Sequence, residues 1–154
     1  KMLVFGLGYD SQMWYNMTNK NTFFVEHNQD YINLNKNINE DNIIFYDYQG
    51  ITVKNSIKFI NDNEFYKNFT IPNKLISQAP FDIILIDGPT GYDDNCPGRL
   101  LPVYWSKHLL SKKGTIIYID DSNRKLEKLS IQKFFKNDKV NYSNLRNGCS
   151  KIIL

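Results

Sequence analysis

The chain has 154 residues and a mass of 18.1 kDa, which suits one domain and leaves little room for two. With 42% hydrophobic and 14% aromatic residues it can build a core, so general disorder is excluded. The net charge of +3 is too small to favour a nucleic acid or an anionic membrane as partner. Two cysteines and two histidines are too few for a disulfide framework or a zinc site.

No apolar run approaches the ~18–20 residues of a membrane-spanning helix, and no signal-peptide pattern is present. We therefore expect a soluble chain without a membrane segment, in the cytoplasm of its cell. Asn, Ile and Lys are abundant, and their codons are rich in A and T, which indicates an AT-rich genome of a protist, a bacterium or a large DNA virus.

Apolar runs alternate with helical patterns along the chain. Strands are expected at 2–5, 22–26, 43–46, 82–87 and 115–119, and two closing strands at 140–142 and 150–154. Helices are expected after Asp10, from about residue 28, over 57–65, over 101–110 and over 125–135. This order predicts a single α/β domain over residues 1–154, with a mostly parallel sheet and helices on both faces.

In such a sheet, ligands bind beyond the carboxyl ends of the strands, where the strand order reverses. Gly6 and Gly8 follow the first strand there, and Asp10 and Ser11 can begin a helix that presents backbone amides to a ligand. Glu26 ends the second strand, where a carboxylate can accept hydrogen bonds from both hydroxyls of a ribose. Together they favour an adenosine-containing cofactor over a plain turn, but do not separate NAD from S-adenosylmethionine.

The fourth strand ends in Asp87, followed by Gly88 and Pro89. Enzymes that methylate the amines of bases carry a Pro-Pro-aromatic motif at this point, so Asp-Gly-Pro argues against N-methylation. A carboxylate beside a methyl donor can accept the proton of an acceptor hydroxyl. The simpler alternative is that Asp-Gly-Pro only makes a turn.

The fifth strand ends in Asp120 and Asp121, and Arg124 follows. Two carboxylates facing Asp87 can hold Mg²⁺ or Mn²⁺, which would acidify a sugar hydroxyl. In the metal-free alternative, one aspartate is a general base and Arg124 pairs with the other or with the substrate. Asp121 can equally cap the next helix. Of these three alternatives, the metal-free role of the two aspartates is slightly favoured.

Three strings in chain order carry a resemblance: residues 4–11, residues 86–92 with 97–99, and residues 120–127. They resemble the glucuronoxylan 4-O-methyltransferase family of plant polysaccharide-biosynthesis proteins, which includes xylan-related members without a demonstrated activity. The similarity covers essentially the whole chain. It implies a three-layer, Rossmann-like S-adenosylmethionine-dependent methyltransferase fold.

The resemblance also implies roles for single residues. Gly6, Gly8, Asp10 and Ser11 would meet the cofactor and Glu26 its ribose; Asp87 would lie beside the methyl group; Tyr92, Arg99 and Arg124 would face the substrate. Asp120 stands where the family usually has histidine, which changes the expected role of this position towards metal or cation contact.

The family carries additional N-terminal sequence, including a membrane anchor in plants, whereas here the first strand begins at residue 2. We therefore expect either a fragment that lacks N-terminal elements or a minimal enzyme. If an anchor has been removed, the Golgi lumen is the alternative compartment.

The function predicted from these features is S-adenosylmethionine-dependent O-methylation of a sugar hydroxyl in a glycan or polysaccharide, with Asp87, Asp120 and Asp121 as catalytic carboxylates. One alternative is a family member that binds the cofactor without catalysis. A less favoured alternative is an enzyme that uses NAD or a nucleotide sugar. A nucleic-acid substrate is disfavoured because no basic stripe is present.

Overall fold

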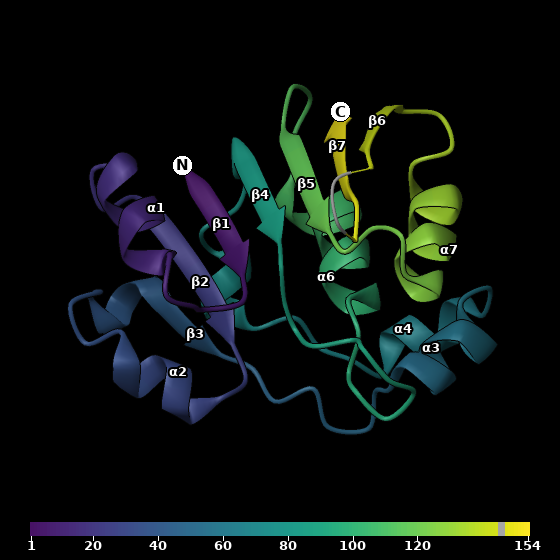
Figure 1. Ribbon diagram of the computed structural model, residues 1–154, viewed down its shortest axis with the longest axis horizontal. Coiled ribbons are helices and arrows are strands. Elements are labelled where there is room, and N and C mark those ends of the chain that lie inside the picture. Colours follow the sequence, from purple (N-terminus) through teal and green to yellow (C-terminus); the bar gives the residue numbers. More distant parts are fainter. Residues whose placement is uncertain (145–146) are drawn as a thin grey trace.

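The computed structural model describes residues 1–144 and 147–154. In these residues seven strands form one sheet in the order β3-β2-β1-β4-β5-β7-β6. Within this sheet, β7 runs antiparallel to both of its neighbours, β5 and β6, and the other strand pairs are parallel. The strands are β1 (Met2–Phe5), β2 (Thr22–Glu26), β3 (Ile43–Phe45), β4 (Ile83–Ile86), β5 (Ile116–Asp120), β6 (Lys139–Ser143) and β7 (Cys149–Ile153). The predicted α/β fold with a mostly parallel sheet is confirmed (Figure 1).

The helices are short, and most lie where the sequence predicts them. They are α1 (Ser11–Met17), α2 (Gln29–Leu34), the 3₁₀ turn η1 (Glu40–Asn42), α3 (Val53–Phe59), α4 (Asn63–Lys67), α5 (Asn73–Ile76), α6 (Leu100–Trp105), its π-helical continuation η2 (Ser106–Leu110) and α7 (Lys125–Phe134). In Figure 1, α1 and α2 lie near the β2–β3 end of the sheet and α7 near the β6–β7 end.

The prediction of one helix over 57–65 was wrong. The chain forms α3 and α4 with a break between them, and α5 follows. The break has a local cause: the Asp62 carboxylate accepts a hydrogen bond from the Glu64 amide at 2.9 Å and caps α4. An aspartate that binds the backbone in this way starts a new helix more readily than it continues an old one.

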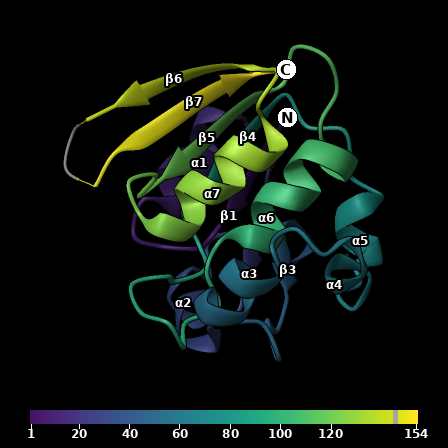
Figure 2. The same cartoon turned by 90° about the vertical axis from the view of Figure 1, so that its right-hand side faces the viewer.

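Apolar side chains cover both faces of the sheet. Leu3, Ile84 and Ile117 lie on one face, fully buried in the larger core beneath α6 and α7. Met2 and Val4 point to the other face, where they pack with Tyr15 of α1 in a smaller core. Strands covered on both faces carry continuous apolar runs, which is why β1 and β4 were readable from sequence. Figure 2 shows α6 and α7 next to each other, beneath the β6–β7 hairpin.

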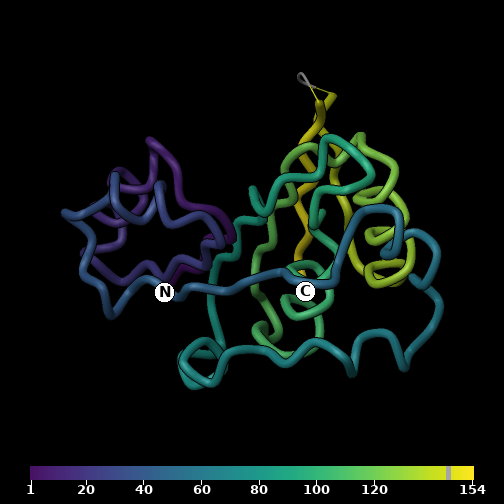
Figure 3. The backbone as a smooth tube through the Cα atoms, turned by 90° about the horizontal axis from the view of Figure 1, so that it is seen from below, coloured from purple at the N-terminus to yellow at the C-terminus, as the bar shows by residue number. Residues whose placement is uncertain are grey.

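The fold places a crevice at the carboxyl ends of β1 and β4. From β1 the chain returns through α1 to β2, and from β4 it returns through α6 to β5, so the two neighbouring strands lead in opposite directions. This is the switch in strand order at which α/β proteins bind ligands. The connection from β3 to α3 crosses the molecule below these strand ends (Figures 1 and 3).

Candidate active site

The loop after β1 packs directly against the loop after β4. Gly6 has a φ of +107°, a conformation that L side chains rarely adopt. A Cβ at Gly88 would lie 2.9 Å from the Gly6 Cα and 3.2 Å from the Phe5 carbonyl oxygen. Both glycines are therefore required for this close backbone approach.

The Glu26 carboxylate organises the neighbouring loop. It is 3% exposed, and it accepts hydrogen bonds from the backbone amides of Leu7, His27 and Asn28, each at 2.7 Å. Burial raises its pKa, but the hydrogen bonds from His27 and these amides outweigh burial, so the pKa lies below its usual value. Glu26 is thus an ionised group that fixes the β1 loop against the end of β2.

Five of the six predicted cofactor residues line one cavity of about 220 Å³: Gly6, Gly8, Asp10, Glu26 and Asp87. The sixth, Ser11, is buried behind the loop, where its hydroxyl oxygen accepts a hydrogen bond from the Gly8 amide at 2.8 Å. Asp10 does not cap α1 with its side chain; its carboxylate accepts a hydrogen bond from the Trp14 indole at 2.9 Å. His27 and Tyr31, which the sequence reasoning did not assign, also line the cavity.

Asp87 faces Asp120 across the ends of β4 and β5. The Asp120 carboxylate lies close enough for its negative charge to raise the pKa of the Asp87 carboxyl. About half of the Asp87 side chain is exposed, yet its carboxyl lies in the crevice. Partial burial raises its pKa, Arg99 lowers it and Asp120 raises it, and the result is about 6. Such a carboxyl exchanges a proton near neutral pH.

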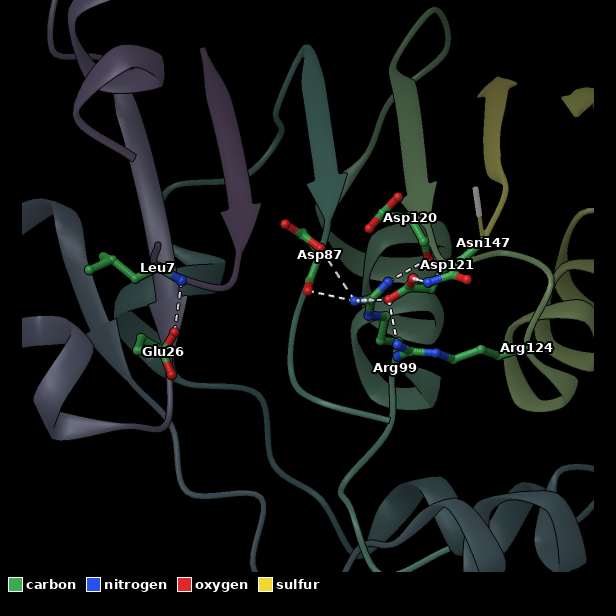
Figure 4. A network of polar contacts seen from close by, with 8 residues as sticks. All are labelled: Leu7, Glu26, Asp87, Arg99, Asp120, Asp121, Arg124 and Asn147. Carbon is green, nitrogen blue, oxygen red and sulfur yellow. Dashed lines mark hydrogen bonds and ion pairs between the residues drawn. The ribbon is translucent and has the colours of Figure 1, made fainter. Parts of the chain in front are cut away.

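Arg99 lies at the centre of a buried ionic network (Figure 4). Its guanidinium donates to the carbonyl oxygens of Asp87 and Asp120 and, at 2.9 Å, to the Asp121 carboxylate. Arg124 and Asn147 also donate to that carboxylate at 2.9 Å. Only 4% of the Arg99 side chain is exposed. Arg99 therefore ties the end of β4 to the end of β5.

These contacts determine whether Asp120 and Asp121 can bind the divalent metal ion considered from the sequence. The carboxylate of Asp121, at a φ of +52°, is occupied by two guanidinium groups and an amide. Among residues 1–144 and 147–154, no group of three or more His, Cys, Asp or Glu side chains could hold a metal ion. Asp120 and Asp121 thus do not fit a Mg²⁺ or Mn²⁺ site, because a cation needs several free oxygen ligands.

A second cavity, of about 520 Å³, lies beside this network. Tyr92 and Arg124, which were predicted to face the substrate, both line it, whereas Arg99 does not. Tyr92 is 75% exposed. Sequence reasoning missed Asn147 and Glu127, which also line this cavity. Nothing distinguishes Asn147 in an Asn-rich chain, and Glu127 is recognisable only once its burial is known.

Comparison with known proteins gives relatives from Arabidopsis thaliana. Glucuronoxylan 4-O-methyltransferase 3 is 30% identical over 146 residues, which are 81% of this chain and 48% of that protein. Glucuronoxylan 4-O-methyltransferase 1 is 30% identical over 144 residues, 81% of this chain and 51% of that protein. The chain is therefore similar to these methyltransferases over most of its length. The resemblance predicted from the three motifs is confirmed, although the chain spans only about half the length of these relatives. No protein-family model matches it.

Solved structures confirm the fold. A methyltransferase of Podospora anserina in its SAH-bound form has a TM-score of 0.54 at 14% identity, covering 99% of this chain and 70% of that one. Human methyltransferase-like protein 13, in complex with SAH, has a TM-score of 0.54 at 11% identity, with the same coverage. The chain therefore has the Rossmann-like methyltransferase fold. In its described residues, no helix has the length and apolar character needed to cross a membrane.

Proposed function

We propose that the protein is an S-adenosylmethionine-dependent O-methyltransferase that acts on a sugar hydroxyl. The observation that carries the proposal is the position of Asp87. This carboxyl lines the cavity formed by the glycine loop, lies at the end of β4, and has a pKa of about 6. A carboxylate with that pKa is ionised at neutral pH and can accept a proton from a bound hydroxyl. The relatives named above support a sugar in a polysaccharide as the acceptor class.

The smaller cavity suits the cofactor. Its lining combines a glycine loop that the cofactor can approach closely with three carboxylates, those of Asp10, Glu26 and Asp87. In our proposal Glu26 keeps its three backbone donors and still offers carboxylate lone pairs to the ribose hydroxyls. The acidic lining complements a positively charged sulfonium. S-adenosylmethionine supplies, when bound, a methyl group that is activated for transfer to a nucleophile.

The protein's own residues would then handle the acceptor. Asp87 would take the hydroxyl proton while the acceptor oxygen is aligned with the methyl group. The O–H bond and the sulfur–methyl bond would break as the new O–C bond forms, which leaves a protonated Asp87 and a neutral thioether. The negative charge of Asp120 makes Asp87 more basic. Arg99 acts as a positioning residue that holds both strand ends, and Asp121 anchors it. Arg124, on the rim of the larger cavity, is assigned to acceptor contact.

The test separates binding from chemistry. Calorimetric titration of the purified chain with S-adenosylhomocysteine should show binding, and a parallel titration with NAD should show none. With S-adenosylmethionine and a xylo-oligosaccharide that carries glucuronic acid, Asp87→Asn should lower kcat about 10²–10⁴-fold, because the base is removed. It should change the S-adenosylhomocysteine affinity far less than kcat, because Asp87 is only one of the residues that line the cofactor cavity. Asp41→Asn, at an exposed position on η1, is the control.

A second candidate is a homologue that binds the cofactor without transferring methyl groups. It is favoured by Asp120, which replaces the usual family histidine, and by Asp121, whose carboxylate is already occupied. Binding of S-adenosylhomocysteine with no transfer to any sugar acceptor would support this candidate. Binding of NAD alone would contradict both. The cellular compartment, cytoplasm or Golgi lumen, stays a prediction.

A further inference from the structure

The Glu127 carboxyl is buried in the wall of the larger cavity, and no side chain or backbone group of the described residues is hydrogen-bonded to it. The residue is 1% exposed, and neither carboxyl oxygen has a hydrogen-bond partner among residues 1–144 and 147–154. Burial raises its pKa, while its own backbone amide and the charges of Arg99 and Arg124 oppose the shift. Buried carboxyl groups are nearly always hydrogen-bonded, so an unpartnered one requires an explanation.

Backbone hydrogen bonds fix the walls of the cavity around Glu127. The backbone amides of Val53 and Lys54 donate to the carbonyl oxygens of Cys96 and Asp94, which fixes α3 to the loop between β4 and α6. The Gly98 amide donates to the Thr90 carbonyl and closes that loop. The volume of about 520 Å³ lies within the usual range of small-molecule sites, ~300–1,000 Å³.

Gly91 leaves room between the cavity and the Glu127 carboxyl. A Cβ at Gly91 would lie 3.4 Å from Glu127 Oε1 and 3.7 Å from Arg124 Nη1. The carboxyl and the guanidinium therefore both lie next to a residue without a side chain. Arg124 also connects the cavity to the catalytic end of the crevice, because its Nη2 lies 2.9 Å from the Asp121 carboxylate.

The chemistry of the lining suits a sugar ring. Val53 and Ile57 provide an apolar wall against which the C–H face of a ring can pack. Asn123, Arg124 and Glu127 provide donors and acceptors for hydroxyl groups. This mixture of an apolar wall and a few polar groups is typical of small-molecule sites.

We propose that this cavity is a second acceptor subsite, in which the Glu127 carboxyl hydrogen-bonds a hydroxyl of the sugar next to the one that is methylated. The inference rests on the proposed sugar O-methyltransferase function. It adds that the protein binds at least two sugar residues of the acceptor, one beside Asp87 and one beside Glu127.

The experiment measures binding rather than turnover. The protein saturated with S-adenosylhomocysteine is titrated calorimetrically with two probes: methyl glucuronoside, and xylobiose that carries one glucuronic acid. The wild type should bind the longer probe more tightly. Glu127→Met keeps the length of the side chain but cannot hydrogen-bond; it should raise the Kd of the longer probe about tenfold or more and leave the Kd of the shorter one unchanged.

Three further measurements distinguish a role of Glu127 in sugar binding from a role in the fold. Glu127→Gln, which still hydrogen-bonds, should retain most of the affinity for the longer probe. Glu64→Met, at an exposed position on α4, should change neither Kd. The Tm of Glu127→Met should stay the same or rise, because an unpartnered buried carboxyl is removed.

Several outcomes would overturn the subsite. An equal loss for both probes would place Glu127 at the methylated ring or in the fold, and no loss would mean that a buried water satisfies the carboxyl. Failure of the wild type to bind either probe would also reject it. Failure of the proposed function has a different signature: no methyl transfer by the wild type, while the Glu127-dependent difference in Kd persists.

Discussion

The two ends of the crevice differ in how their buried carboxylates are bound. At the β1–β2 end the carboxylate is hydrogen-bonded by backbone amides, whereas at the β4–β5 end it is bound by other side chains. Glu26 is fixed by three amides close to it in the fold. Asp121 is fixed by the nearby Arg124 and by Arg99 and Asn147, which come from distant parts of the chain. Figure 4 shows the two groups on opposite sides of the crevice. The first arrangement suits a cofactor that needs a fixed cradle. The second depends on every partner being present, because each charge in it is partly or fully buried.

The largest expected effect comes from removing the centre of the side-chain network. Arg99→Met leaves the Asp121 carboxylate with fewer partners in a buried place, so we expect a loss of about 3–5 kcal/mol in the free energy of unfolding. Urea unfolding followed by circular dichroism measures it. Arg124→Met, at a more exposed partner of the same carboxylate, should cost no more than about 1 kcal/mol. Similar losses in both variants would mean that Arg99 is not the centre of the network.

Breaking the contact between Gly6 and Gly88 should disturb the β1–β2 end of the crevice. A Cβ in Gly88→Ala would meet backbone atoms of Gly6 and Phe5, so the loops must separate. We expect about 1–3 kcal/mol of destabilisation and weaker binding of S-adenosylhomocysteine. Gly8→Ala is the matched control for stability, since its Cβ would meet only the Asp10 carboxylate at 3.4 Å. A Gly88→Ala variant as stable as Gly8→Ala would show that the loops are not packed as described.

The Glu26→Gln variant tests the backbone-held carboxylate. A side-chain amide cannot accept all three backbone donors, so we expect about 1–3 kcal/mol of destabilisation at pH 7 and weaker S-adenosylhomocysteine binding. Because the folded pKa of Glu26 is lowered, its contribution is present above its unfolded pKa of about 4.5 and is lost as the pH falls through the folded value. The stability difference between wild type and variant should therefore shrink in acid. A difference that is constant from pH 7 to pH 3 would contradict the assignment.

The smallest effect is a pH dependence at the side-chain end. With the pKa of Asp87 at about 6, its carboxyl is protonated below that pH and cannot accept a proton. We expect kcat/KM for methyl transfer to fall about tenfold per unit as the pH drops below about 6. Asp120→Asn removes the neighbouring negative charge, so its acid limb should move to lower pH. An unchanged limb in Asp120→Asn would assign the titration to another group.

The sequence alone determined most of the strands and the places where polar residues follow them. The apolar runs at β1, β4 and β5 are long enough to indicate buried strands, and Asp87 and Glu26 lie at strand ends by position in the chain. The three motifs also identified the relatives. These signals are local in sequence, so they can be recognised without knowledge of the tertiary packing.

Only the tertiary structure decided what the charges do. Arg99 was predicted to face the substrate, and the structure buries its guanidinium between Asp87 and Asp121, which are 12 and 22 residues away in the chain. The same contacts occupy Asp121 and remove it from the expected metal site. Glu127 looked like one more charge on a helix until its burial was known. Local sequence fixes neither the solvent exposure of a charge nor its distant partners, because both depend on how the elements pack.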